Sequence, residues 1–389
     1  MKVALLHDYL NQAGGAERVL LALSELYPDA PIYTLIHDKK RLSGFEGKDI
    51  RTSFLQKMPL ASSKIRWYLP LMPVAIEQLD LSNYDIVISS TSALIKGAIT
   101  HPQTLHICYC HTPTRYLWSE AHQYSKEIKE SKLAKPFLPW LLNKLRLWDQ
   151  VAAQRVNHFI ANSHFIARRI KNYYNRESTV IYPPVDTHNF YIAKEPGNYY
   201  LLISRLKPYK KVDLAIQAFN KLNIPLKIIG IGEEEDKLRK MAKPNIEFLG
   251  AVSEEDKRKY LSECLALIHP QIEDFGLTAI EAMASGRPVI AYAGGGALET
   301  VIDGQTGKFF DEQAWEALID TILKFKPQAY NPQAIKNYAE KFNTQIFYAQ
   351  IQDFIAKTWA EFKKQNEATP TGVSNSPLLQ CERNPVPKA

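Results

Sequence analysis

The chain has 389 residues, of which 46% are hydrophobic and 23% are charged. This length suits two domains better than one, and the apolar fraction excludes a disordered chain, which would lack the residues to form a core. The four cysteines contain no CxxC pair, which excludes a disulfide scaffold and indicates reduced thiols in a cytosolic protein. The net charge of +7 suits anionic partners such as nucleotides, phosphates or a membrane surface, without selecting among them.

The sequence predicts neither a signal peptide nor a membrane span. Residues 1–10 are typical of a strand that ends at His7-Asp8. No run approaches the ~18–20 uncharged apolar residues that a spanning helix requires. We therefore expect a cytoplasmic location, with peripheral contact to the inner face of the membrane as a further hypothesis.

Short apolar runs alternate with amphipathic segments along the first half of the chain. The segment 16–26 is a predicted helix, because Val19, Leu20 and Leu23 fall on one helical face. The apolar runs are near-continuous rather than alternating, as a parallel sheet buried on both faces requires. The predicted strands of this half are residues 2–7, 30–36, 85–90, 105–110, 158–161 and 179–182.

The second half repeats this succession of strands and helices. The segment 212–222 is a predicted helix with Val212, Ala215 and Phe219 on one face. Two such arrays predict an α/β protein with two doubly wound, Rossmann-like domains. The predicted strands of this half are residues 199–204, 226–229, 246–249, 265–269 and 288–292.

The chain is predicted to divide into four parts. A stretch rich in Pro, Asn and Gly, residues 183–197, separates a first domain (1–190) from a second domain (191–343). Residues 344–364 predict a terminal helix that crosses back to the first domain. Residues 365–389 hold several prolines and few apolar residues, which predicts a disordered tail.

In open parallel sheets, ligands bind at the carboxyl ends of the strands, so the turns there are the candidate sites. Gly14-Gly15 follows the first strand, and its glycines allow close approach of backbone to a ligand at a helix N-terminus. An ordinary tight turn explains these glycines equally well. His111 ends a later strand and is followed by Arg115 and Trp118. A single histidine is often structural, but this position at a strand end favours a function.

The second half carries basic residues after its first strand. Arg205 offers a planar fork and Lys210 a point charge, and both suit a diphosphate held between two domains. A solvated basic loop is the alternative interpretation. Gly250, with Val252 beside it, ends another strand, and such a turn can admit a purine or uracil ring. The Rossmann fingerprint GxGxxG is absent from this half, since position 235 is Glu.

A third turn in this half brings two carboxylates together with free amides. Glu273 lies in the loop, and Glu281 lies about one turn into a helix predicted over 277–284. The amides near Gly276, Leu277 and Thr278 can hold an anion, and the carboxylates can bind sugar hydroxyls. An acidic turn that complements the helix dipole explains Glu273, but it does not explain Glu281.

These motifs, taken in register, resemble family 4 glycosyltransferases, which are retaining enzymes of the two-domain GT-B fold with a central cleft. The resemblance covers about residues 1–360 and rests on Arg205…Lys210, Glu273-x7-Glu281 around Phe275-Gly276, and the later Gly294…Glu299 and Asp303…Gly307. Further segments look like the subgroup of mannosyltransferases that build O-antigen and related surface polysaccharides. They are Arg146…Asp149, Asn162-Ser163, Arg168-Arg169-Ile170 and Tyr182…Asp186.

The resemblance implies a hexosyltransferase that moves mannose from GDP-mannose to a glycan or lipid-linked acceptor. It implies a first domain on the acceptor side and a second domain that binds the nucleotide-sugar. The implied catalytic residues are His111, Arg205, Lys210 and Glu273. The implied donor-binding residues are Gly15, Arg205, Lys210, Gly250, Val252, Glu273, Phe275, Gly276, Leu277, Thr278 and Glu281. The implied acceptor-side residues are Gly14, Gly15, Arg115 and Trp118.

The same resemblance implies no metal ion and no other cofactor, because Arg205 and Lys210 can neutralise the diphosphate. No nucleic-acid partner is expected. The turn Gly294…Glu299 departs from the family's usual Gly-Gly-Ile-Pro-Glu, which leaves the donor sugar open. The alternative function is a non-transferring relative that binds a nucleotide-sugar, either a 2-epimerase or an inactive partner subunit.

Two basic stretches lie beside aromatic residues in the first half. One spans residues 39–66 and precedes Trp67, and the other precedes Phe137 and Trp140. This combination suits an anionic bilayer that carries a lipid-linked acceptor. A solvated basic face over a partly buried helix explains it equally well. The lysines of the second stretch are Lys126, Lys129, Lys132 and Lys135.

Overall fold

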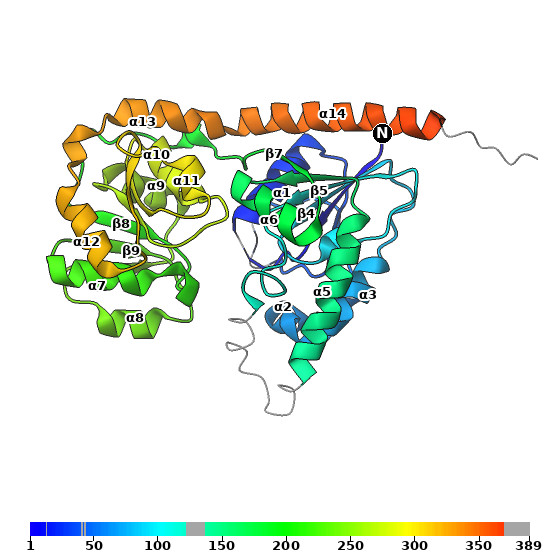
Figure 1. The fold of residues 1–389 in the computed structure, drawn as a ribbon, viewed down its shortest axis with the longest axis horizontal. Helices are drawn as coiled ribbons and strands as arrows, with labels where there is room; N and C mark the ends of the chain where they lie inside the picture. The colour runs from blue at the N-terminus through cyan, green and yellow to red at the C-terminus, as the bar shows by residue number, and fades with distance from the viewer. Residues whose placement is uncertain (13, 40–41, 43, 122–136, 369–389) are drawn as a thin grey trace, which may run out of the picture.

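The computed structural model describes residues 1–12, 14–39, 42, 44–121 and 137–368. Two domains, each built on a parallel sheet between helices, lie side by side, and a long C-terminal helix extends from the second domain along the first (Figure 1). This is the α/β architecture with two Rossmann-like domains that the sequence predicts.

The first domain holds a seven-stranded sheet in the order β3-β2-β1-β4-β5-β6-β7, with every neighbouring pair parallel. Every residue of β1, β4 and β5 is buried, which explains their continuous apolar runs. The strands are β1 (Val3–His7), β2 (Ile32–Thr34), β3 (Ile50–Thr52), β4 (Ile86–Thr91), β5 (Leu105–Cys110), β6 (His158–Ala161) and β7 (Ser178–Val180).

Helices cover both faces of this sheet, and alternate residues of β1 face two different cores. Leu5 packs in the cluster that includes Leu20 of α1, whereas Leu6 packs in the cluster that includes Ile76 of α3 and Leu142 of α5. The helices are α1 (Gly15–Leu26), α2 (Ala61–Lys64), α3 (Met72–Glu77), α5 (Leu138–Gln154) and α6 (His164–Tyr174), with short 3-10 turns η1 (Phe54–Lys57), η2 (Ile65–Leu71) and η3 (Ile95–Gly97).

The second domain holds a six-stranded parallel sheet in the order β10-β9-β8-β11-β12-β13. Its strands are β8 (Tyr200–Ile203), β9 (Leu226–Ile229), β10 (Ile246–Gly250), β11 (Leu267–His269), β12 (Val289–Tyr292) and β13 (Gly307–Phe310). Its helices are α7 (Val212–Leu222), α8 (Glu235–Met241), α9 (Glu254–Glu263), α10 (Leu277–Ala284), α11 (Ala297–Thr300), α12 (Trp315–Lys324) and α13 (Pro332–Ala339). The order in which the strands are added across each sheet reverses between β1 and β4 and between β8 and β11. Ligands of such sheets bind at this switch point.

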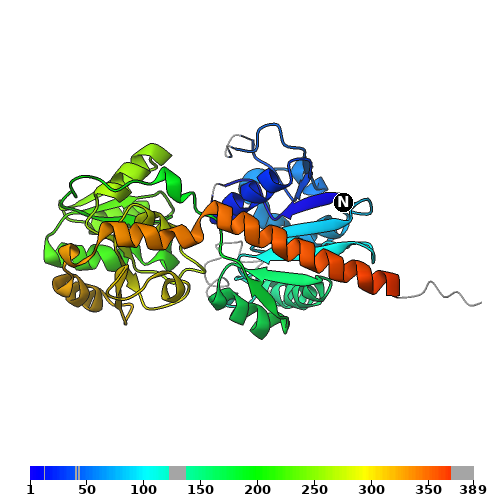
Figure 2. The ribbon, with the colours of Figure 1, turned by 90° about the horizontal axis from the view of Figure 1, so that it is seen from above.

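The helix α14 (Thr344–Ala368) follows the second domain but packs on the first (Figure 2). Phe347, Ile351 and Ile355 lie four residues apart on one helical face, and all three are buried in the core of β1 and α1. The helix extends past residue 364, so the first residues of the expected tail are helical. The rest of that tail, 369–389, lies outside the described residues.

Candidate active site

The carboxyl ends of the two sheets face each other, because residues from both strand-end regions are in contact. A Cβ on Gly15, at the start of α1, would lie 2.7 Å from Leu277 Cδ1, at the start of α10. Arg205 follows β8 and donates from Nη1 to Gln12 Oε1 of the first domain at 2.9 Å. The strand-end turns that the sequence singles out in each half therefore form one region between the domains.

The centre of this region is an ion pair between Lys210 and Glu273. Lys210 ends the short turn η6 (Pro208–Lys210) and is buried, although it is a lysine on a loop. Gln271 Nε2 also donates to Glu273 Oε1 at 3.1 Å. Burial raises the pKa of Glu273, but Lys210, His269 and Arg115 together lower it by more, so that the pKa is about 2. The carboxylate is therefore ionised at neutral pH.

The N-terminus of α10 lies directly beside this pair. Gly276 precedes the helix with φ of +96°, a left-handed conformation that favours glycine. Phe275 is buried, and its ring stacks on Tyr182 with centroids 5.4 Å apart, which fixes the turn. The first amides of α10, from Leu277 and Thr278, have no partner within the helix, so this turn is suited to bind an anion.

His269, at the end of β11, is a residue of this site that the sequence reasoning missed. Its Nε2 atom is buried without a hydrogen-bond partner among the described residues, and it lies 3.4 Å from where a Cβ of Gly276 would be. Burial lowers the pKa of His269 to about 4, so the ring is neutral at neutral pH. Its position at a strand end, the signal that identified His111, was present in the sequence.

Glu281 is almost fully buried on α10 and is held by two cations. Arg18 of α1 donates from Nη1 to Glu281 Oε1 at 2.5 Å, and Lys257 of α9 donates to the same oxygen at 3.1 Å. Burial raises the pKa of Glu281. The charges of Arg18 and Lys257 together lower it by more, so the net shift of the pKa is downward. Glu281 therefore connects the two domains through Arg18, a contact that the sequence did not predict.

Arg115, expected on the acceptor side, reaches across to the second domain. It forms an ion pair with Asp274, and Arg169 of α6 pairs with the other oxygen of the same carboxylate at 3.2 Å. Asp274 O also accepts from Ser163 Oγ at 2.6 Å. These contacts hold the loop before α10 against the first domain.

His111 follows β5 and is 8% exposed. Its Nε2 atom lies 2.8 Å from Ser90 Oγ of β4, and its carbonyl oxygen accepts from Asn162 Nδ2 at 2.9 Å. Burial, together with the nearby His7, lowers the pKa of His111 to about 3. This ring is therefore neutral at neutral pH and is held at a fixed place at the end of the sheet.

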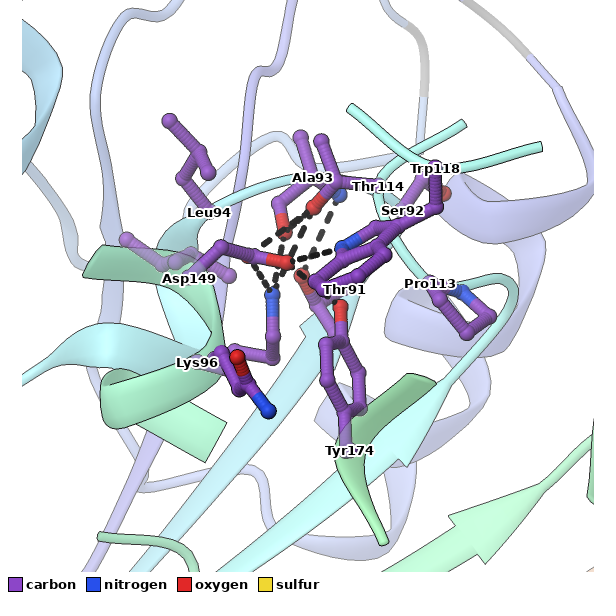
Figure 3. Close-up of polar contacts among 12 residues, drawn as sticks. Thr91, Ser92, Ala93, Leu94, Lys96, Pro113, Thr114, Trp118, Asp149 and Tyr174 are labelled. Atoms are coloured by element: carbon purple, nitrogen blue, oxygen red, sulfur yellow. Dashed lines mark hydrogen bonds and ion pairs between the residues drawn. The ribbon is translucent and has the colours of Figure 1, made fainter. Parts of the chain in front are cut away.

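Trp118, also expected on the acceptor side, turns its polar atom into the first domain. Its indole Nε1 donates to Asp149 Oδ2 at 2.7 Å, and its ring stacks on Tyr173 with centroids 5.1 Å apart. Figure 3 shows Lys96, Thr114, Trp118 and Tyr174 around the carboxylate of Asp149. This buried cluster fixes the segment that follows His111, because a buried indole N–H needs an acceptor.

Gly14, Gly250 and Val252 are the remaining predicted residues. Gly250 ends β10 with φ of +68°, and a Cβ there would meet nothing within 4 Å. Val252 and Leu277 are partly buried against the same hydrophobic cluster. Gly14 caps α1, and a Cβ there would lie 2.9 Å from Glu17 Oε2.

Within residues 1–12, 14–39, 42, 44–121 and 137–368, no group of three or more His, Cys, Asp or Glu can hold a metal ion. Over the same ranges, no helix combines the length and hydropathy needed to cross a bilayer. Whether the reaction needs a metal stays a prediction.

Known protein families match both domains. Residues 186–342 match the model "Glycosyl transferases group 1", and residues 13–189 match "Glycosyltransferase Family 4". The boundary between the two matches falls in the stretch that joins the two sheets.

Several characterised proteins and solved structures are similar to this chain. Alpha-1,3/1,6-mannosyltransferase ALG2 of Dictyostelium discoideum is 24% identical over 434 residues, covering 92% of this chain and 98% of that protein. O-antigen chain mannosyltransferase RfbU of Salmonella typhimurium is 26% identical over 229 residues, covering 54% of this chain and 62% of that protein. The crystal structure of Anabaena HepE in complex with UDP has a TM-score of 0.68 and 18% identity, covering 92% of this chain and 100% of that one.

Sucrose-phosphate synthase from Thermosynechococcus elongatus has a TM-score of 0.71 and 16% identity, covering 93% of this chain and 100% of that one. Because the identities to HepE and to this protein are low, the two structural similarities show the fold alone. The fold is GT-B, as the resemblance implies. The two family matches add the class of reaction. The chain therefore consists of a GT4-type glycosyltransferase domain followed by a group 1 glycosyltransferase domain, and it is an enzyme of the hexosyltransferase class.

Proposed function

We propose that this enzyme is a retaining glycosyltransferase that moves mannose from GDP-mannose to a glycan or lipid-linked acceptor in surface polysaccharide or glycolipid synthesis. The observation that carries the proposal is the Lys210–Glu273 pair beside the N-terminus of α10, at facing strand ends of two domains. The names of the relatives ALG2 and RfbU, both mannosyltransferases, support the sugar.

In this proposal the donor lies against the second domain. Arg205 and Lys210 bind the two phosphates, together with the amides of Leu277 and Thr278. Lys210 pairs with Glu273 in this structure, so a phosphate and Glu273 share its charge when the donor binds. Glu273 then binds hydroxyls of the donor sugar.

Glu281 binds the ribose hydroxyls in this proposal. Arg18 and Lys257 already hold its carboxylate, so the ribose must share or displace one of these cations. Arg18 comes from the other domain and is 43% exposed at its side chain, whereas Lys257 is 8% exposed. Arg18 is therefore the cation that can move, and donor binding is coupled to the contact between the domains.

The chemical step forms a bond between an acceptor oxygen and the anomeric carbon of the sugar. The bond from that carbon to the β-phosphate oxygen breaks, and the nucleotide diphosphate leaves. The acceptor attacks the face that the phosphate vacates, and the phosphate takes the acceptor's proton. Arg205, Lys210 and the α10 amides stabilise the charge that grows on the leaving group. This route needs no metal and no other cofactor.

The alternative is a 2-epimerase or an inactive partner subunit on the same fold. Only a transferase gives release of the nucleotide diphosphate that depends on an acceptor. Purified protein is incubated with GDP-mannose, UDP-glucose or UDP-GlcNAc, with and without lipid-linked oligosaccharide. We expect GDP release that needs the acceptor and is lost in Lys210→Ala but kept in Lys240→Ala, a matched variant at an exposed lysine of α8. Release from a UDP-sugar alone would overturn the donor, and binding of a nucleotide-sugar without acceptor-dependent release would favour the alternative.

We also propose that the first domain docks on an anionic membrane that carries the acceptor. Trp67 of η2 is 54% exposed, and Phe137, directly before α5, and Trp140 of α5 are 72% and 64% exposed. Lys64 and Lys144 lie over the two tryptophan rings, at 4.1 and 5.9 Å. The elements that carry these residues pack on one hydrophobic cluster and lie together at one end of the domain (Figure 1). The lysines Lys126, Lys129, Lys132 and Lys135 lie outside the described residues.

Flotation with phosphatidylglycerol vesicles tests this docking. We expect binding that falls with salt and with Trp67→Ala or Trp140→Ala, because exposed aromatics and basic residues together favour an anionic interface. Leu323→Ala, at a leucine of α12 that is 71% exposed in the other domain, is the matched control. Equal flotation with neutral vesicles, or none at all, would contradict the proposal.

A further inference from the structure

Behind His111, three buried side chains form a line that ends at its ring. Glu17 Oε1 of α1 lies 3.6 Å from His7 Nε2, at the end of β1. His7 Nδ1 lies 3.2 Å from Ser90 Oγ, and Ser90 Oγ lies 2.8 Å from His111 Nε2. The exposed fractions are 6% for Glu17, 2% for His7, 0% for Ser90 and 8% for His111. The line therefore runs through the interior of the first domain and reaches the site from within.

The three contacts allow one consistent order of donors when both rings are neutral. The negative carboxylate of Glu17, 3.6 Å from His7 Nε2, electrostatically favours the proton of His7 on Nε2 and leaves Nδ1 as an acceptor. Ser90 has one proton and donates it to that Nδ1. Its oxygen is then free to accept from His111, which places the proton of His111 on Nε2.

We propose that Glu17, His7 and Ser90 are positioning residues that hold His111 as its Nε2–H tautomer and present Nδ1 as a hydrogen-bond acceptor for a hydroxyl of the donor sugar. The tautomer follows from the contacts with both rings neutral, whereas the sugar contact rests on the proposed function. In this proposal the three residues act only through His111. A neutral acceptor at this place selects a sugar hydroxyl rather than a phosphate oxygen, which has no proton to donate.

The neighbouring residue on β4 provides a matched control. Ser89 Oγ lies 2.9 Å from His106 Nε2, and both residues are fully buried. Successive residues of a strand face opposite sides of the sheet, so this second Ser–His pair lies away from His111. Ser89→Ala removes the same hydroxyl from the same strand without touching the proposed line.

The first test is ring-nitrogen NMR on protein with ¹⁵N-labelled histidine at pH 8, with the His111 signals assigned from His111→Asn. We expect the Nε2–H tautomer at His111, a mixture of tautomers in Ser90→Ala, and no change in Ser89→Ala. His7→Asn keeps an acceptor near the position of Nδ1 and should retain more of the Nε2–H form than His7→Leu does. An Nδ1–H ring in the unmodified protein, or a spectrum that Ser90→Ala leaves unchanged, would overturn the proposal.

The second test separates positioning from general damage. Ser90→Ala should lower kcat/KM for the nucleotide-sugar about five- to tenfold, as expected for one misplaced hydrogen bond. The Kd for the free nucleotide diphosphate should not change, because that product lacks the sugar that His111 contacts. Equal losses in both would indicate a structural role and contradict the proposal. If no nucleotide-sugar is turned over, the proposed function fails, and the NMR result still decides the tautomer.

Discussion

Two lysine–carboxylate pairs in this enzyme differ in how many hydrogen bonds their carboxylates accept from the rest of the protein. Lys96–Asp149 has side-chain exposures of 1% and 0%, and its carboxylate also accepts from Thr114, Trp118 and Tyr174. Lys210–Glu273 has exposures of 11% and 18%, and its carboxylate has only Gln271 as a further hydrogen-bond donor among the described residues. The first pair uses its bonding capacity within the protein, as a structural pair should. The second keeps capacity for a ligand.

Removing the carboxylate of Asp149 should have the largest effect on stability. Asp149→Ala leaves Lys96 buried without a counter-charge, so we expect the free energy of unfolding to fall by about 3–5 kcal/mol. Urea unfolding followed by circular dichroism measures this loss. The double variant Lys96→Met/Asp149→Leu removes both charges and should recover a large part of it. A stability close to that of the unmodified enzyme in Asp149→Ala would contradict a structural role for this pair.

The Lys210–Glu273 pair should show the reverse, a large loss of activity with a smaller loss of stability. Lys210→Ala removes a cation that stabilises the leaving group, and we expect kcat to fall about 10²–10³-fold. Steady-state release of the nucleotide diphosphate measures the effect, with Lys240→Ala as the control. If Lys210→Ala unfolds as easily as Asp149→Ala, the distinction between the two pairs fails.

Unfolding at several pH values tests how much the Lys210–Glu273 pair contributes to stability. The pKa of Glu273 is about 2 when folded, below its ordinary value of 4.5. A carboxylate with a lowered pKa stabilises the fold above about pH 4.5, and this stabilisation is lost as the pH falls towards 2. Glu273→Gln should therefore be less stable than the unmodified enzyme at pH 6, with a gap that narrows below pH 4.5. Urea unfolding at pH 6, 4 and 3 checks this; a gap that widens in acid has the wrong sign.

The smallest expected effect concerns the contact between the domains. Gly15→Ala places a methyl group 2.7 Å from Leu277 Cδ1, so the domains must move apart slightly or Leu277 must turn. We expect about a tenfold loss of activity, because a small misplacement at a closing site is costly, with little change in stability. Gly15→Ala/Leu277→Ala restores the space and should regain activity relative to the single variant. No loss in Gly15→Ala would show that the contact is not needed for turnover.

The central strands and several helices were predictable because they are fully buried and periodic. The edge strands β3 and β13 were missed, since Ile50–Thr52 is largely exposed and Gly307–Phe310 is only partly buried. Neither segment has the apolar run that identifies a strand buried on both faces.

The site was predictable as a set of strand-end turns, but its pairings were not. Glu281 with Arg18 and Asp274 with Arg115 join residues that lie 263 and 159 positions apart. No local pattern indicates that two such residues meet, because the contact depends on how the domains face each other. Trp118 was correctly placed after a strand end, yet its indole needed an acceptor, which the fold supplies from α5 as Asp149.

The crossing of α14 has a consequence for the order in which the chain folds during synthesis. The core of β1 and α1 is completed by Phe347, Ile351 and Ile355, which leave the ribosome after the whole second domain. Part of the apolar interior of the first domain therefore stays uncovered while the second domain is translated. The first domain is complete only when the final helix docks.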